Sequence, residues 1–146
     1  KYFPYQQATI TRTFNLLKRR KSMEDEQLYQ ECIFRLENIL ASCKYFAGEY
    51  PVAYTILKKL NDQATNDRNF MDSWMARDAS EAGLELAFMK YFRGATYIRM
   101  GELEPGMTAF NESKDKFVEL GRDDWVKRVE TTMDEAMQKL TEPIKV

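Results

Sequence analysis

The stretch GATYIRMGELEPGMTAFNES, residues 94–113, has glycine and aromatic residues at spacings that suit two packed helices. Gly94 and Gly106 carry no side chain, so helices that meet at these positions can approach each other closely. Gly101 lies between them, where a turn is needed, and large residues such as Phe110 can fill the space that remains. The stretch therefore predicts two antiparallel helices joined by a tight turn.

Proline and glycine punctuate the rest of the chain in the same way. They stand at or near the ends of segments with helical periodicity, at Pro4, Gly48, Pro51, Gly101, Pro105, Gly106, Gly121 and Pro143. No segment alternates polar and apolar residues for long enough to form a strand, and no Asn-Gly or Asp-Gly pair marks a hairpin. The predicted fold class is all-α, with antiparallel helix pairs wherever the turns are short.

The periodicity gives bounds for each helix. We expect helices over 6–20, from the capping box at 22–25 to 47, and over 51–60, 70–77, 79–100, 103–120 and 123–140, with a loop at the polar residues 61–69. The first helix is expected to bury Ile10, Phe14 and Leu17. The second is expected to bury Leu28, Cys32, Leu36, Ile39, Leu40 and Cys43.

Part of the spacing occurs twice. Gly94, Tyr97, Gly101, Gly106, Phe110 and Ser113 stand at offsets 0, 3, 7, 12, 16 and 19, and Ala41, Gly48, Ala53 and Leu57 stand at offsets 0, 7, 12 and 16. This pattern resembles the tetratricopeptide repeat, a family of helix pairs that stack side by side. The first unit departs from the pattern at Lys44, where the family has an aromatic residue, and at Leu60, where it has a small one. Neither unit has the family's terminal proline.

The resemblance implies an architecture for the whole chain. Repeat-like pairs would span about 24–64 and 79–120, and a capping helix would span about 123–140, within a single helical domain of residues 1–146. The pairs would form a right-handed superhelical array. The two units start further apart than the roughly 34 residues of the regular repeat. An additional segment, mostly residues 61–79, therefore interrupts the array.

In this family the first helix of each pair lines a concave groove that takes peptides or helices from partner proteins. Carried over to this chain, the groove positions are Arg35, Asn38, Ser42, Tyr45, Phe46, Phe88, Tyr91, Ala95, Ile98 and Arg99. One subgroup grips acidic chaperone tails with lysine and asparagine at set positions, and here only Asn38 agrees with that set. An apolar or mixed peptide, or an amphipathic helix, suits these residues better. Several of the aromatic residues could instead pack in the core.

Composition points away from catalysis and from nucleic acid. The 146 residues contain 22 basic and 23 acidic residues, a formal net charge of -1, and no histidine. Balanced charge does not favour a nucleic-acid partner. The absence of histidine removes the commonest general base and the commonest metal ligand. No phosphate-binding glycine loop or metal-ligand spacing is present. The sequence therefore predicts no enzyme, no catalytic residues, no metal and no cofactor.

The cysteines and the first residues suggest where the chain belongs. Cys32 and Cys43 lie eleven residues apart on one predicted helix, about 16 Å along its axis, too far for a disulfide. Two unpaired thiols favour a reducing, cytoplasmic location. The chain begins at Lys1 without an initiator methionine, so we expect a fragment of a longer protein. No apolar run is long enough to span a membrane.

These observations lead to three hypotheses about function. The first is a non-catalytic adaptor or scaffold that binds a partner peptide or helix in the groove. The second is a regulatory sensor domain that controls an attached effector domain. The third is a structural subunit packed permanently within a protein complex, and a homo-oligomer is also compatible with the sequence.

Overall fold

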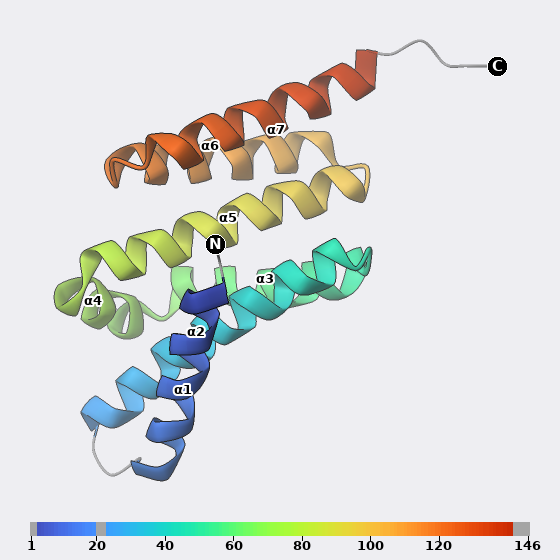
Figure 1. Ribbon diagram of the computed structural model, residues 1–146. Coiled ribbons are helices and arrows are strands. Elements are labelled where there is room, and N and C mark those ends of the chain that lie inside the picture. Colours follow the sequence, from blue (N-terminus) through green and yellow to red (C-terminus); the bar gives the residue numbers. More distant parts are fainter. Residues whose placement is uncertain (1–2, 20–22, 142–146) are drawn as a thin grey trace.

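The computed structural model describes residues 3–19 and 23–141 (Figure 1). Over these two ranges the chain forms α-helices and no strand: α1 (Phe3–Arg19), α2 (Met23–Phe46), α3 (Tyr50–Asn66), α4 (Arg68–Arg77), α5 (Ala79–Arg99), α6 (Leu103–Glu119) and α7 (Asp123–Thr141). The all-α prediction is confirmed. Ser22, expected to cap the second helix, lies outside the described residues.

Two glycines end helices as the sequence predicts. Gly101 follows α5 with a φ of +82°, a left-handed conformation that other residues rarely adopt. Its backbone N–H donates to the carbonyl of Ile98, 3.1 Å away, and the next N–H, of Glu102, donates to Tyr97 at 2.9 Å. Gly48 ends α2 in the same conformation, with φ at +80°. These bonds satisfy carbonyl groups that a helix end leaves without partners, so the following helix can start at once.

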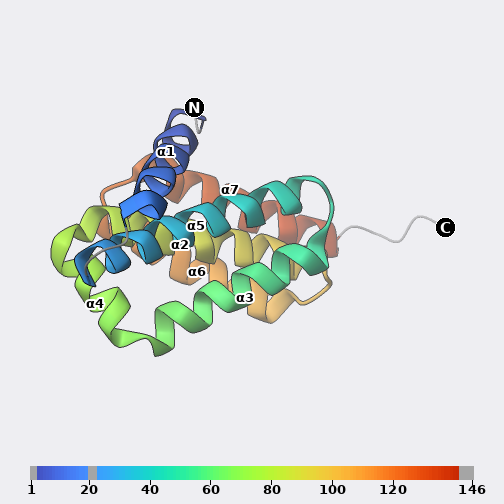
Figure 2. The same ribbon diagram turned by 90° about the horizontal axis from the view of Figure 1, so that it is seen from below.

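The helices form layers with α5 in the middle. In Figure 1, α6 and α7 lie on one side of α5, and α2 and α3 lie on the other. Seen from below in Figure 2, α3 and α6 lie toward one edge of the molecule, and α1 and α7 lie toward the other. Helix α5 packs against α2, α3, α4, α6 and α7, and α1 packs against α2.

The closest helix contact is the one between α5 and α6. A methyl group on Gly94 would lie 2.8 Å from the ring carbon Cδ1 of Phe110 and 2.9 Å from the backbone oxygen of Gly106. A methyl group on Gly106 would meet Ile98 at 2.8 Å and the backbone oxygen of Gly94 at 3.1 Å. The two backbones therefore touch with no room for a side chain, which confirms the close approach predicted from the glycine spacing.

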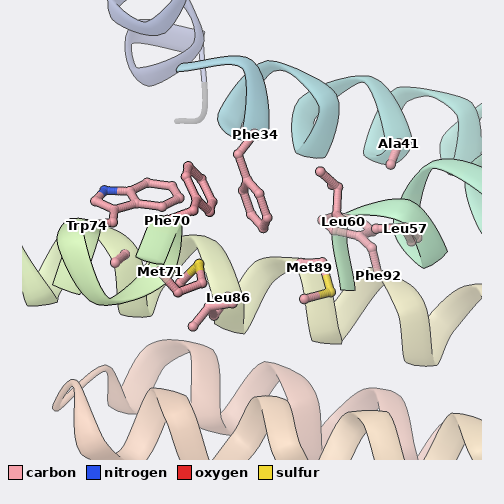
Figure 3. Close-up of a cluster of buried hydrophobic side chains, with 11 residues drawn as sticks. Phe34, Ala41, Leu57, Leu60, Phe70, Met71, Trp74, Leu86, Met89 and Phe92 are labelled. Carbon is pink, nitrogen blue, oxygen red and sulfur yellow. The ribbon is translucent and has the colours of Figure 1, made fainter. Parts of the chain in front are cut away.

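Buried apolar side chains fill the space between the layers. The cluster in Figure 3 joins α2, α3, α4 and α5, and its members are Phe34, Ala41, Leu57, Leu60, Phe70, Met71, Trp74, Ala82, Leu86, Met89 and Phe92. A second cluster on the opposite side of α5 contains Ala87, Phe88, Ala95, Phe110, Phe117 and Val129. Helix α5 contributes to both clusters, so its side chains are buried on both sides.

The loop predicted at residues 61–69 is wrong. Helix α3 continues to Asn66, only Asp67 separates it from α4, and the side chain of Asp67 accepts a hydrogen bond from the backbone N–H of Phe70 at 3.2 Å. Polar residues without glycine or proline do not break a helix. The segment remains helical because Leu60 and Phe70 at its two ends are both buried in the apolar core.

The predicted face of α1 is wrong, and that of α2 is confirmed only in part. In α1, Thr9 and Thr13 are buried, whereas Ile10 and Phe14 are 40% and 61% exposed. The side chain of Leu17 lies outside the described part of the chain. In α2, Cys32 is buried as predicted and Leu28, Leu36 and Ile39 are half-buried, but Leu40 and Cys43 are exposed. The other buried residues of α2 are Glu31, Phe34, Arg35, Asn38, Ala41 and Ser42. Hydrophobic periodicity fails here because the first turns of α5 and the end of α4 present charged side chains to α2, and polar residues of α2 meet them.

The contact at Gly94 generates a stability prediction. Gly94→Ala should lower the free energy of unfolding by about 1–3 kcal/mol, because the new methyl group would collide with backbone as well as with a ring. Gly83→Ala is the matched control in the same helix, since there the methyl group would meet only the end of the flexible Leu120 side chain, at 3.1 Å. Urea titration followed by circular dichroism measures both. Equal effects of the two substitutions would contradict the close backbone contact.

Candidate partner-binding site

A cavity of about 350 Å³ opens where four helices meet. Tyr45 near the end of α2 lines it, together with the last turns of α5, the start of α6 and the second half of α7. The lining residues are Tyr45, Ala95, Ile98, Arg99, Gly101, Leu103, Phe110, Thr132, Glu135, Ala136 and Lys139. Four of the ten predicted groove residues, Tyr45, Ala95, Ile98 and Arg99, are among them. We call this hollow the inner cavity.

The walls of the inner cavity combine apolar and charged groups. Ala95, Ile98, Leu103, Phe110 and Ala136 provide apolar surface. The polar groups are a phenol, a hydroxyl, a carboxylate and two cationic side chains, the last from α5 and α7. Such a composition is typical of a recognition site, in which apolar area supplies affinity and a few polar groups set orientation.

Arg99 is held in place at this cavity by two tyrosines. Its guanidinium carbon lies 5.9 Å from the centre of the Tyr50 ring, a distance at which a cation is attracted to the ring face. A hydrogen bond to the Tyr45 side chain raises the pKa of Arg99 further above its already high ordinary value. The side chain is therefore a fixed positive charge.

Aromatic contacts position α7, which lines the inner cavity together with α5. The Trp125 ring stacks on Phe117, with centroids 5.4 Å apart and an interplanar angle of 15°, and meets Phe88 edge-on at 4.9 Å. The hydroxyl groups of Tyr91 and Thr132 are hydrogen-bonded at 3.0 Å, and burial raises the pKa of Tyr91. These contacts place the following turns of α7, which line the cavity.

The remaining predicted groove residues lie elsewhere. Phe88 is buried among core side chains, and Tyr91 packs on Phe110, Phe92 and Trp125 without lining the cavity. Phe46 is 75% exposed and makes edge-on contacts with Tyr45 and Phe92, at 5.3 Å and 5.8 Å. It is thus an exposed aromatic ring next to a residue of the inner cavity.

The groove positions predicted on the middle of α2 need correction. Arg35, Asn38 and Ser42 are only 6%, 1% and 5% exposed, so they are not open to a partner in this structure. The Asn38 amide donates to the backbone oxygen of Glu85 at 3.0 Å and to its carboxylate at 3.1 Å. Arg35 lies 3.7 Å from the carboxylates of both Glu81 and Glu85. These residues join α2 to α5 because α5 places two glutamates against them.

Further charged residues extend these contacts into an ion-pair network that is buried at Glu31, Arg35 and Glu85 and partly exposed at Arg12 and Arg77. Arg77 of α4 pairs with Glu31 of α2 and, at 3.3 Å, with Glu81 of α5. The indole N–H of Trp74 donates to Glu81 at 3.0 Å, and Arg12 of α1 lies 3.7 Å from the same carboxylate. The network thereby links four helices through Glu81. None of its members lines the inner cavity.

The sequence analysis did not predict this network, nor that α7 contributes a wall of the inner cavity. The spacing of Glu31, Arg35 and Asn38, and of Glu81 and Glu85, places charged or amide groups on one helix face. From the sequence alone, a helix face with charged and amide groups is expected to be exposed to solvent, because the helix that packs against it is not known. The predicted capping helix over 123–140 likewise gave no sign of a binding surface. Four of its residues nevertheless recur at the spacing of a single helix face and line the cavity: Thr132, Glu135, Ala136 and Lys139.

The described residues were also compared with what a metal site or a membrane-spanning helix requires. Within residues 3–19 and 23–141, no group of three or more histidine, cysteine, aspartate or glutamate side chains is arranged to hold a metal ion. Over the same ranges, no helix combines the length and the apolar character needed to cross a membrane. Cys32 is buried and Cys43 is exposed, and both are free thiols.

The buried carboxyl group of Glu85 generates a pH prediction. Burial raises the pKa of Glu85 well above 4.5, so its folded-state pKa exceeds its unfolded-state value. The stabilisation from the neutral form is present below about pH 4.5 and is lost as the pH rises through the folded-state pKa. Glu85→Gln keeps an acceptor for Asn38 but has no proton to lose. Its free energy of unfolding should therefore increase relative to wild type between pH 4.5 and neutrality.

The control for this prediction is Glu130→Gln, which removes an exposed carboxylate paired with Lys114 at 3.0 Å. Denaturant titrations of all three proteins at several pH values measure the difference. Parallel pH profiles for wild type and Glu85→Gln would show that Glu85 is ionised at little cost in the folded protein, with Arg35 and Asn38 compensating its burial.

Comparisons with protein-family models, with curated proteins and with solved structures give no match for this chain. The resemblance to the tetratricopeptide repeat accordingly rests on the residue spacings in this chain and on the close approach of Gly94 and Gly106. The case for a function rests on the inner cavity and on the side chains that line it.

Proposed function

We propose that this protein is a non-catalytic interaction module that binds a peptide or helix of a partner protein at the inner cavity. One observation carries the proposal: Tyr45, Ala95, Ile98 and Arg99, selected from the sequence as groove positions, line a single cavity. They come from α2 and α5, the first helices of the two repeat-like pairs. In this interpretation α3 and α6 complete the pairs, α4 is an insertion, and α7 caps the array.

The dimensions and walls of the cavity suit a protein side chain. A volume of about 350 Å³ lies at the small end of the range for ligand sites and accommodates one or two large side chains. Helices that dock in grooves bury such side chains from successive turns while their polar face stays in water. The exposed Phe46 ring beside Tyr45 offers further apolar area at the α2 end.

The chemistry of the lining residues favours binding over catalysis. The pKa of Arg99 is raised above its already high ordinary value, so this group keeps its proton at neutral pH and is unsuited to act as a general base. Glu135 is the one carboxylate among the lining residues, and it is exposed on the surface of α7. Recognition of a partner requires only these fixed charges and the apolar walls, so we favour an adaptor or scaffold role.

The sensor and structural-subunit hypotheses use the same cavity differently. A sensor would transmit occupancy of the cavity to an attached domain, and a structural subunit would hold one partner there permanently. Exchangeable binding of short peptides separates the adaptor from the permanent subunit. We place the adaptor in a reducing compartment such as the cytoplasm, because the exposed Cys43 thiol is free.

Filling the cavity tests the proposal. Ala136 lines the cavity and is 8% exposed, so the tryptophan of Ala136→Trp should occupy the space intended for a partner side chain. A display library of random peptides of about 16 residues, panned against wild type, should yield binders that fail to bind this variant. The control is Thr131→Trp, which adds the same side chain to an exposed site on α7 outside the cavity and should keep binding.

Circular dichroism and thermal unfolding must first show that both tryptophan variants are folded. The proposal fails if the library yields no wild-type binders, or if every binder also binds Ala136→Trp as tightly as it binds wild type. A cavity that merely completes the core would give the first of these results.

A further inference from the structure

The charges around the inner cavity indicate what kind of partner segment it takes. We propose that the segment carries an acidic side chain beside a large apolar one, the apolar group entering the cavity and the carboxylate pairing with Arg99 and Lys139. This inference rests on the proposed function, since it specifies the chemistry of the partner at the same site.

Arg99 and Lys139 differ from most cations on this surface. Among the described residues, six other lysines lie within ion-pair distance of a carboxylate and Lys127 does not: the pairs are Lys44 with Glu49, Lys58 with Asp62, Lys59 with Glu37, Lys90 with Glu112, Lys114 with Glu130 and Lys116 with Glu119. In the part of the chain that the structure describes, no carboxylate lies within 4.0 Å of the charged groups of Arg99 or Lys139. Both nevertheless line the inner cavity, from different helices.

Arg99 is prepared to receive an anion. Its position over the Tyr50 ring restricts the side chain before any partner arrives. Binding then costs less side-chain entropy than it would for a mobile arginine. The guanidinium has five N–H donors, two of which can bind both oxygens of a carboxylate at once.

The apolar half of the proposed segment follows from the cavity wall. Ile98 and Leu103 are half-buried and would be buried further by a large aliphatic or aromatic side chain, which would also reach the edge of the buried Phe110. An acidic residue three or four positions away on an amphipathic helix would lie at the rim, near the surface charges. Glu135, on α7, disfavours a second carboxylate on its own side and is outnumbered by the two cations. A basic segment would meet those two cations unfavourably.

Charge reversal at Arg99 tests the inference. The same random-peptide library is panned separately against wild type, Arg99→Glu and Lys127→Glu. Lys127 is exposed on α7 and does not line the cavity, so Lys127→Glu changes the net charge equally without changing the site. We expect aspartate and glutamate to be enriched in the peptides selected by wild type and by Lys127→Glu, and lysine and arginine in those selected by Arg99→Glu.

Individual peptides then give the size of the effect. Replacing the acidic residue of a selected peptide by its amide should weaken binding to wild type about threefold or more, as measured by fluorescence polarisation at low salt. The same replacement should leave binding to Arg99→Glu unchanged or tighter. Glu135→Gln should strengthen binding of the acidic peptide, because a repulsive charge is removed.

The outcomes separate this inference from the proposed function. Peptides that require an open cavity, yet show no acidic enrichment and bind Arg99→Glu equally well, would overturn the acidic preference and leave the interaction module standing. Selection of basic peptides by wild type would overturn it too. If no peptide distinguishes wild type from Ala136→Trp, the proposed function fails, and the inference that rests on it fails with it.

Discussion

The direct contact between the backbones of Gly94 and Gly106 is the constraint on which the rest of the structure depends. Because α5 and α6 meet without intervening side chains, the ring of Phe110 can lie across the junction, where it lines the inner cavity. The turn at Gly121 then returns the chain toward α5, and Trp125 packs on Phe117 and Phe88 to set the course of α7. The fixed distance between α5 and α6 therefore helps to determine the shape of the cavity.

The other side of α5 is organised by charge. Glu81 and Glu85 face α2 and α4, where Arg35, Arg77 and Asn38 meet them in a largely buried setting. Burying charged groups costs solvation free energy that pairing recovers only in part, so such a network adds little to stability. The network instead fixes the positions of the helices relative to one another, since each charged side chain can pair with its partner in only one arrangement. We interpret the network as the set of contacts that holds helix α4 in register with α2 and α5.

The sequence allowed the turns and the close helix contact to be predicted, because glycine and proline act through local backbone geometry that needs no knowledge of neighbours. It did not allow the buried face of α2 to be predicted. Arg35 and Asn38 are internal because α5, far along the chain, supplies carboxyl and carbonyl groups that pair with them. The loop predicted at the polar residues 61–69 was wrong for a related reason. Polar side chains indicate that a segment is exposed to solvent, and they do not indicate that it is not helical. The α7 wall of the cavity was missed because an exposed helix face and a cavity wall have the same composition.

The position of α5 in the chain has a consequence for biosynthesis. Asn38 and Glu85, which connect α2 to α5, are separated by 47 positions, whereas α5 and α6 are consecutive. Local contacts form at a smaller loss of chain entropy, so the α5–α6 hairpin is expected to assemble before α2 docks on it. On the ribosome, however, the first four helices emerge earlier. Phe34, Phe70 and Trp74 can pack on one another as soon as α2 and α4 have emerged, but the side of their cluster that α5 covers stays open until α5 is synthesised.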